Sequence, residues 1–134
     1  MKLKIAHQIR TNNFNDKQML DKITKLWREA SEKINDQDVI KYGVYFDYQA
    51  DYKGDYSLAV GIEAEDGDLE IPERLNFKVF QVDKADEMGI VNTWAEIWKL
   101  EDEQSLERAY TFDFEKYYPN GDVEIYIALK DTGN

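Results

Sequence analysis

The sequence contains no cysteine and only one histidine, His7, among its 134 residues. Without thiols the chain can form no disulfide, no thiolate-ligated zinc site and no cysteine nucleophile. A single histidine near the start also makes a multi-histidine metal site and a Ser-His-Asp triad poor interpretations. We therefore expect no metal and no cofactor. The chemistry that remains is ligand binding or catalysis by carboxylates.

Long apolar runs are missing as well. None approaches the ~20 residues that a membrane-spanning helix requires, and Met1–Ile5 lacks the apolar stretch of a signal peptide. A cytoplasmic protein without membrane contact is the simplest expectation. Basic residues are also few, with 17 Lys and Arg against 28 Asp and Glu, which gives a net charge of −11. Such a field repels phosphate backbones, so we expect no direct binding of nucleic acid. A cationic ligand or a basic protein partner is favoured, although solubility alone also explains the charge.

The acidic residues do not form a recognisable calcium loop. Asp47, Asp51 and Asp55 recur every four residues, and residues 65–70 are acidic. Neither segment has the alternating acids and distant glutamate of an EF-hand. The sequence also has no glycine-rich phosphate loop.

Apolar periodicity predicts two helices. Residues 16–34 carry apolar side chains at three- and four-residue spacing, which is typical of an amphipathic helix. Asn15 is a candidate N-cap, and Gln18 occupies the capping-box position. Trp27 falls on the apolar stripe, which favours a core role over a site role. A second, shorter helix is predicted over residues 91–100.

Runs of β-branched and aromatic residues between turn signals predict the strands. Pro119–Asp122 contains Asn-Gly, a strong signal for a tight turn. Around Tyr56 one strand alternates large and small residues, and the small face, with Ser57, Ala59 and Gly61, leaves room for something to lie on it. The predicted strands cover residues 3–11, 39–48, 55–63, 77–82, 110–117 and 123–129.

The predicted elements occur in the order strand, helix, strand, strand, and the second half of the chain repeats this order. The order predicts an α+β fold of two similar modules sharing an antiparallel sheet, with both helices on one face. A ligand cleft is then expected on the other face of the sheet or at the seam between the modules. No linker interrupts the chain, so residues 1–134 are expected to form one domain.

Several segments resemble the GyrI-like family, the effector-binding domain of AraC- and MerR-type regulators. The segments have the family's order and spacing, and they extend back to Asn12-Asn13. They comprise Tyr42–Tyr48 with Asp51, Gly54, Asp55, Tyr56 and Gly61, then Trp94–Trp98, then Asp113–Tyr117 with Val123–Ile127.

The resemblance implies duplicated strand-helix-strand-strand modules with pseudo-twofold symmetry and a cleft between them. Relatives bind hydrophobic cations, drugs and dyes there, with aromatic side chains against the ligand and a glutamate opposing its charge. In many relatives the domain follows a DNA-binding helix-turn-helix. Here the chain begins at the domain itself, so we expect a stand-alone form acting as a sensor or sequestering protein. A link to transcription regulation or to drug or toxin resistance is implied.

Glu115 is the best single candidate for a site residue. In Phe112-Asp113-Phe114-Glu115, strand alternation places the phenylalanines on one face and the acids on the other. If the phenylalanines face the helices, Glu115 and Asp113 face the cleft. A glutamate among aromatic rings has a raised proton affinity, and a cation would restore its charge. The alternative is an ordinary solvated acid, one of many in this sequence.

Aromatic residues supply the other candidates, because the faces of Trp and Tyr attract cations. Aromatic residues are also common in cores, so at least one of the two tryptophans near residue 96 is expected to pack on the sheet. Trp94 is favoured to line the cleft, whereas Glu96 is as well explained as a solvent-facing acid. Tyr126 alternates with Ile125 and Ile127 and is expected to point away from the helix-packed core. The ligand-binding candidates are Glu115, Trp94, Tyr48, Tyr56, Tyr126, Trp98 and Tyr110.

Three functions remain open from the sequence. The first is non-catalytic binding of a hydrophobic ligand that is cationic or aromatic. The second is hydrolysis of cyclopropane-bearing genotoxins, which the resemblance also implies, with Glu115 as base and a cleft tyrosine as proton donor. The third is a protein-binding role, with a regulator or, as in gyrase-inhibiting relatives, DNA gyrase as partner. The same residues serve the first two, so the sequence does not separate them.

Overall fold

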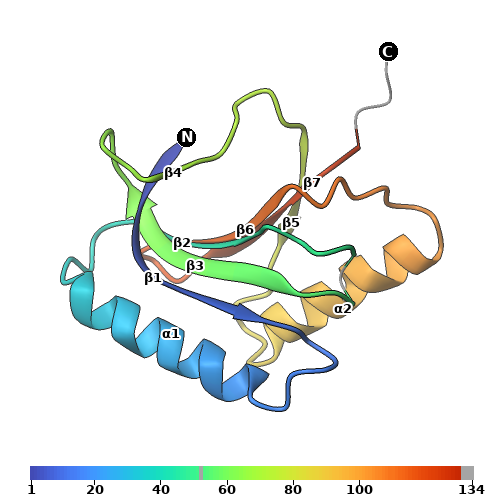
Figure 1. Ribbon diagram of the computed structural model, residues 1–134, viewed down its shortest axis with the longest axis horizontal. Helices are drawn as coiled ribbons and strands as arrows, with labels where there is room; N and C mark the ends of the chain where they lie inside the picture. The colour runs from blue at the N-terminus through green and yellow to red at the C-terminus, as the bar shows by residue number, and fades with distance from the viewer. Residues whose placement is uncertain (52, 131–134) are drawn as a thin grey trace.

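The computed structural model describes residues 1–51 and 53–130. Residue 52 and the last four residues of the domain expected over 1–134 lie outside the described residues. Within the described part the chain forms a seven-stranded sheet and two helices (Figure 1). The elements are β1 (Lys2–Thr11), α1 (Met19–Lys33), β2 (Lys41–Phe46), β3 (Tyr56–Glu63), β4 (Leu69–Glu70), β5 (Phe77–Gln81), α2 (Gly89–Asp102), β6 (Phe112–Tyr117) and β7 (Val123–Ala128).

The strand order shows that the sheet is built from two equivalent halves. Its order is β4-β1-β3-β2-β6-β7-β5, and all its pairs are antiparallel. On each side of the central β2–β6 pair comes the hairpin partner, β3 or β7, and then the first strand of the module, β1 or β5. The α+β class and the repeated strand-helix-strand-strand order are thus confirmed. The β2–β6 ladder, from Lys41 opposite Tyr117 to Phe46 opposite Phe112, is the seam between the modules.

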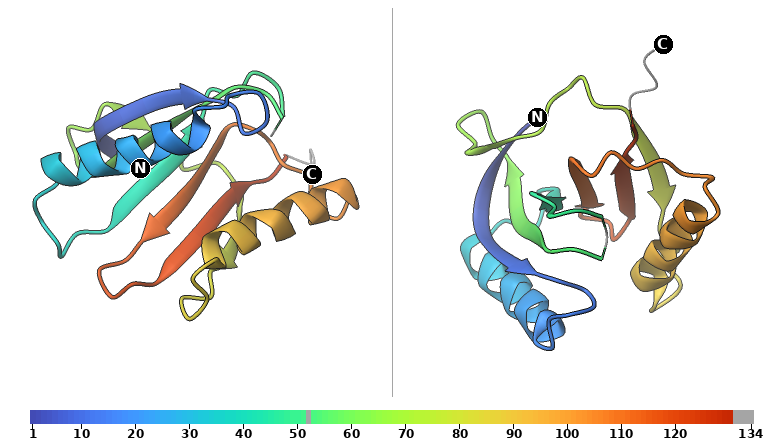
Figure 2. Two further views of the ribbon diagram at one scale, coloured as in Figure 1. Left: turned by 90° about the horizontal axis from the view of Figure 1, so that it is seen from below. Right: turned by 45° about the vertical axis from the view of Figure 1, so that its right-hand side comes forward.

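Each helix packs on the strands of its own module, and both lie on the same side of the curled sheet (Figure 2). The periodicity of α1 buries Leu26 and Ala30 in a cluster with Leu58 of β3. Ile97 of α2 is buried in a second cluster that contains Ile125 of β7. Fully burying such an aliphatic side chain contributes about 1.5–3 kcal/mol. The helices are therefore fixed to separate halves of the sheet, on either side of the seam.

The opposite face of the sheet is filled by a third cluster. Phe114 stacks on Tyr126 with ring centroids 4.5 Å apart, and Val44 and Ile71 are buried beside them. Ile71 belongs to the connection between β3 and β5, which passes on the side of the sheet away from the helices (Figure 1). This connection contains β4, whose pairing with β1 the sequence did not predict. This face is occupied by side chains of the protein itself.

The small residues of β3 are also covered, contrary to the expectation that their face is free. Ser57 and Ala59 are buried, and Ser57 Oγ accepts a hydrogen bond from Arg10. A side chain at Gly61 would meet the backbone of β1, because its Cβ would lie 2.4 Å from the carbonyl oxygen of Lys4. The small residues thus serve close packing within the sheet.

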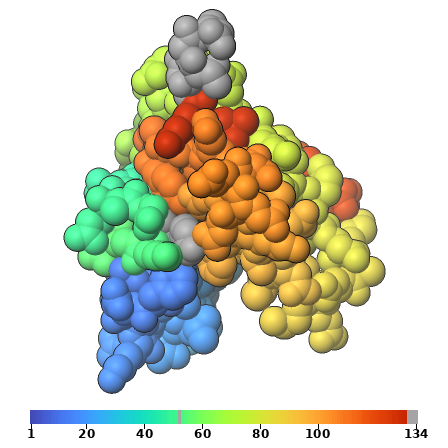
Figure 3. Space-filling model, turned by 90° about the vertical axis from the view of Figure 1, so that its right-hand side faces the viewer, coloured from blue at the N-terminus to red at the C-terminus, as the bar shows by residue number. Residues whose placement is uncertain are grey.

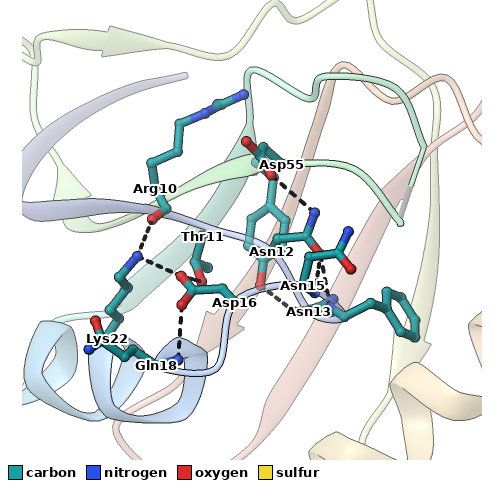
Figure 4. A network of polar contacts seen from close by, with 11 residues as sticks. Arg10, Thr11, Asn12, Asn13, Asn15, Asp16, Gln18, Lys22 and Asp55 are labelled. Carbon is teal, nitrogen blue, oxygen red and sulfur yellow. Dashed lines mark hydrogen bonds and ion pairs between the residues drawn. The ribbon is translucent and has the colours of Figure 1, made fainter.

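Helix α1 begins later than predicted. Its N-cap is Gln18, without a side-chain capping bond, and Asn15 is not the cap. The reason is Asp16, whose carboxylate accepts hydrogen bonds from the backbone N–H of Gln18, from Thr11 and from Lys22 (Figure 4). The bonds to Lys22, Gln18 and Thr11 lower the pKa of Asp16 to about 2. These hydrogen bonds hold the residues just before α1 in turns rather than in a helix.

The closing hairpin has the predicted tight turn. Gly121 has φ = 94°, which favours glycine, and the backbone N–H of Tyr118 donates to the carbonyl of Asp122. The second helix is longer than predicted, at Gly89–Asp102 instead of 91–100. Among the described residues, neither helix has the length and apolar character needed to cross a membrane.

Candidate functional site

A cavity of about 470 Å³ lies over the seam, between α1 and α2. In Figure 3 an open notch separates the blue residues at the start of α1 from the gold residues of α2. The sequence led us to expect a cleft either at the seam or on the face opposite the helices. The cavity lies at the seam, and the expectation of a cleft on the opposite face is wrong. The physical reason is that each helix packs on its own half of the sheet and leaves the seam strands uncovered between them. The aromatic lining consists of Phe14, Trp27, Tyr45, Tyr48, Tyr56, Trp94, Trp98 and Tyr117.

All three tryptophans of the chain contribute to this lining. Trp94 and Trp98 come from α2, as expected. Trp27 comes from α1, where its stripe position predicted a core role. It packs edge-on against Tyr117, with centroids 4.8 Å apart, and also faces the cavity. The apolar stripe of α1 therefore serves both the core and the cavity wall.

Glu115 lies at the floor of the cavity and is only 3% exposed. One carboxylate oxygen accepts hydrogen bonds from Trp94 Nε1 at 2.8 Å and the Tyr45 hydroxyl at 3.1 Å. The other accepts the Tyr117 hydroxyl at 2.8 Å. Desolvation by burial raises the pKa of Glu115 above its ordinary value, and the three hydrogen bonds oppose this rise. Among the described residues no lysine or arginine forms an ion pair with Glu115.

Alternation along β6 brings Glu115 to the cavity, but its neighbours have the opposite orientation from the one expected. Phe114 points to the cluster on the far face, so the phenylalanines do not face the helices. The acids Asp113 and Glu115 do, since the cavity is on the helix side. Glu115 thus faces the cavity, whereas the assumption that Phe112 and Phe114 face the helices is wrong.

Gly43 makes room for this arrangement from the neighbouring strand. It is paired with Glu115 across the β2–β6 ladder. A Cβ at Gly43 would lie 3.1 Å from Trp27 Cζ2 and 3.3 Å from Glu115 Oε1. Gly43 was not among the candidates from the sequence, although an isolated glycine within a strand is a known signal of close approach.

A second buried polar cluster adjoins the cavity. Asp113 is fully buried and accepts Arg108 Nη2 at 2.7 Å, the Tyr48 hydroxyl, and the backbone N–H of Ala128 at 2.9 Å. Arg108 is 3% exposed and also contacts Glu101, at 3.4 Å. Burial disfavours the charge of Arg108 and is the largest single influence, but Asp113, Tyr48 and Tyr110 together raise the pKa of Arg108 above its ordinary value. Arg108, which lines the cavity, had no signal in the sequence pattern.

The structure separates the candidate residues into two groups. Five line the cavity, and two do not. Tyr110 packs edge-on against Tyr48, with centroids 5.3 Å apart, and donates to Glu101 behind the wall. Tyr126 points away from the helices as expected, which places it on the far face and outside this cavity. Glu96 is exposed. The five in the lining are Glu115, Trp94, Trp98, Tyr48 and Tyr56.

The loop between β1 and α1 contributes Asn13 and Phe14 to the cavity lining. Figure 4 shows the polar contacts that hold this loop. The side-chain oxygen of Asn12 accepts hydrogen bonds from the backbone N–H groups of Phe14 and Asn15, and its amide nitrogen donates one to Asp55. Asn13 accepts the hydroxyl of Tyr56. The Phe14 ring reaches Trp98 of the other module, at 6.3 Å between centroids. The Asn12-Asn13 entry thus holds an aromatic contact across the mouth.

Comparison with known proteins agrees with this geometry. The sequence model of the integron-associated effector-binding proteins, Cass2, matches residues 4–129. The chain belongs to this family. A solved structure, the integron cassette protein VCH_CASS2 from the mobile metagenome of Vibrio cholerae, is 25% identical with a TM-score of 0.69. The match covers 97% of this chain and 92% of that one. A search of curated proteins finds no match. These findings support an effector-binding fold of the GyrI-like type.

The cavity of this family member offers lipophilic contact around an acidic group, Glu115, with Arg108 as the second charged side chain of the lining. Aromatic rings present faces that attract positive charge, and Glu115 supplies a full negative charge when it is ionised. Within residues 1–51 and 53–130, no three His, Asp or Glu side chains gather so that they could hold a metal ion. The arrangement suits a small organic molecule with a largely apolar surface.

Because burial raises the pKa of Glu115, the stability of the fold should depend on pH. A carboxylate whose pKa is higher in the folded state stabilises the fold fully below its unfolded pKa. This contribution is lost as the pH rises through the folded pKa, and a difference of one pKa unit between the two states is worth about 1.4 kcal/mol. Glu115→Gln cannot titrate, so the melting temperature of the wild type relative to this variant should fall as the pH rises from 4 to 8. Thermal melts across this range measure it. A constant difference at every pH would contradict the raised pKa.

Proposed function

We propose that this protein binds a bulky, lipophilic cation in the cavity between α1 and α2, with Glu115 as its counter-charge. The single observation that carries the proposal is a carboxylate that is 3% exposed, surrounded by aromatic rings, and without an ion-pair partner among the described residues. Burying an unpaired charge is costly, and such groups are retained mainly where function needs them.

A cation in the cavity would remove this cost. It would restore the ionised form of Glu115 and replace the missing counter-ion. Each aromatic face that the cation contacts adds ~0.5–2 kcal/mol, depending on desolvation. Trp94 is well placed, because its indole N–H is bonded to Glu115 and its ring lines the cavity. The other wall, Trp27 and Ile23 of α1, is lipophilic.

The same geometry favours binding over hydrolysis. A hydrolase would need a tyrosine whose hydroxyl is free to donate to the substrate. The hydroxyls of the four tyrosines in the lining all donate to acceptors of the protein itself: Tyr45 and Tyr117 to Glu115, Tyr48 to Asp113, and Tyr56 to Asn13. The hydrolase therefore remains the alternative. Incubation with a cyclopropane-bearing compound, followed by mass analysis for added water, tests it.

A sensing or sequestering role is the biological form that we propose for this binding. The description of the matching family, integron-associated effector-binding protein, supports it. The GyrI-like resemblance adds the finer hypothesis of kinship with effector domains of AraC- and MerR-type regulators. Docking on a regulator or on gyrase stays a prediction, since it rests on the acidic charge and the resemblance alone.

The proposal is tested with a matched pair of probes, tetraphenylphosphonium and tetraphenylborate, which share size and shape but differ in charge. We expect the cation to raise the melting temperature by several degrees, since a ligand at a hundred times its dissociation constant stabilises by about 2.7 kcal/mol. It should also change the tryptophan fluorescence, because all three tryptophans line the cavity. The anion should do neither. Equal binding of both ions, or no binding of either, would contradict the proposal.

A further inference from the structure

The cavity wall contains a positive charge, that of Arg108, which faces two carboxylates. Arg108 lines the cavity, yet its guanidinium is directed to Asp113, with Nη2 and Oδ2 2.7 Å apart. A second acid, Glu101, lies 3.4 Å from Nη1. Two carboxylates thus compensate one guanidinium. Among the described residues Arg108 Nε has no hydrogen-bond partner, so hydrogen bonding does not use the whole guanidinium.

Trp94 connects this cluster to Glu115. Its indole N–H donates to Glu115, and the Arg108 guanidinium carbon lies 5.8 Å from the centre of its ring. The charge of Arg108 is therefore within one side chain of the acid that faces the ligand. At a separation of several ångströms in a medium of intermediate dielectric constant, an uncompensated charge changes an ion's affinity on the order of tenfold to a hundredfold. If Arg108 were uncompensated, it would cancel much of the attraction that Glu115 offers.

We propose that Asp113 determines the charge specificity of the cavity: by neutralising Arg108 from behind the wall, it leaves Glu115 as the unbalanced charge facing the ligand. Asp113 is fully buried and bonded to Tyr48, Arg108 and the backbone of Ala128, so a ligand does not touch it. It acts through Arg108 and is a specificity-determining positioning residue. This inference rests on the proposed binding of cations.

A structural role for Asp113 predicts a different result from a specificity role. If Asp113 only supports the fold, its loss weakens the binding of every ligand alike. If it sets the charge balance, its loss weakens cation binding and strengthens anion binding. The quantity to measure is therefore the ratio of the dissociation constants of tetraphenylborate and tetraphenylphosphonium, which a uniform loss of structure leaves unchanged.

The first variant is Asp113→Asn, which leaves Arg108 without its main counter-charge. We expect the ratio to fall on the order of a hundredfold, as the cation loses and the anion gains affinity. Asp68→Asn is the matched control, because it makes the same change in net charge at an exposed acid bonded to the Ile5 N–H on the far side of the molecule. Its ratio should equal that of the wild type.

A second variant removes the freed charge. In Arg108→Met/Asp113→Asn neither charge remains, and replacing both members of a buried ion pair is better tolerated than removing one. The preference for the cation should return to near the wild-type value. Glu101→Gln completes the series, because its partly exposed side chain compensates Arg108 from further away. It should lower the ratio about threefold. If Asp113→Asn does not fold, Glu101→Gln carries the test.

The outcomes separate the inference from the proposed function. A wild type that binds neither probe, or both equally, overturns the proposed function. A wild type that prefers the cation, with unchanged ratios in Asp113→Asn or, where that variant does not fold, in Glu101→Gln, overturns the inference alone. A double variant whose ratio stays as low as that of Asp113→Asn also overturns it, because the freed charge of Arg108 would then not be the cause.

Discussion

Glu115→Gln should weaken the binding of tetraphenylphosphonium on the order of a hundredfold at pH 7.5. This is the effect of one charge removed at about 6 Å in a medium of intermediate dielectric constant. Glutamine has nearly the same shape, and its carbonyl oxygen can still accept from Trp94, which now donates to Glu115 at 2.8 Å. The aromatic walls remain. The loss therefore measures the charge, and titration of the tryptophan fluorescence gives both dissociation constants.

The dependence on pH gives the same prediction an independent form. Burial raises the pKa of Glu115, and the protonated acid offers no charge to a cation. As the pH falls through this raised pKa, the wild type should lose affinity, up to tenfold per pH unit, while Glu115→Gln stays flat. The neighbouring hydroxyls of Tyr45 and Tyr117 have raised pKa values, and Arg108 stays protonated, so none of them titrates in this range.

Two results would contradict this role for Glu115. One is a glutamine variant that keeps the wild-type affinity at neutral pH. The other is a wild-type affinity that does not change between pH 8 and pH 4. Tetraphenylborate serves as the control ligand, because weaker binding of the cation should not be accompanied by weaker binding of the anion. A variant that loses both has lost the shape of the cavity.

The modules were predictable from the sequence because each depends on local signals. Strand alternation, the stripe of α1 and the Asn-Gly turn at Gly121 all operate over a few residues. The start of α1 was missed although its cause is also local, because the hydrogen bonds of Asp16 with Thr11 and Lys22, five and six residues away, leave no mark in the apolar periodicity. Strand β4 was missed for a different reason. It is two residues long and exists through pairing with β1, more than sixty residues away.

The site shows the same division. Glu115 could be nominated because alternation along one strand and the resemblance to a family both pointed to it. Tyr45, which donates a hydrogen bond to Glu115, and Arg108, which lines the same cavity, could not, because their places in the site depend on the tertiary fold. Tyr45 reaches Glu115 only through the β2–β6 register, which joins residues about seventy positions apart. Arg108 becomes relevant only once the seam brings Trp94 between it and Glu115. Long-range register carries the information that local patterns lack.

Gly43→Val should both destabilise the protein and abolish the binding of tetraphenylphosphonium. The backbone of Gly43 is not in the left-handed region, and valine favours strands, so neither the conformation nor the propensity opposes the change. The cost comes from packing, since a Cβ there would lie 3.1 Å from Trp27 Cζ2 and 3.3 Å from Glu115 Oε1. Overpacking of this kind costs about 1–3 kcal/mol. Thermal or denaturant unfolding measures it.

Replacing Trp27, which the added valine side chain would strike, separates a local clash from a general disturbance of β2. In Gly43→Val/Trp27→Leu the smaller leucine should accept the added methyl groups, so the double variant should be more stable than the sum of the single changes implies. Contacting residues typically show coupling of about 0.5–3 kcal/mol in such a cycle. Binding should recover only in part, since Trp27 also lines the cavity. Strictly additive stabilities would mean that the cost of Gly43→Val does not come from a clash with Trp27.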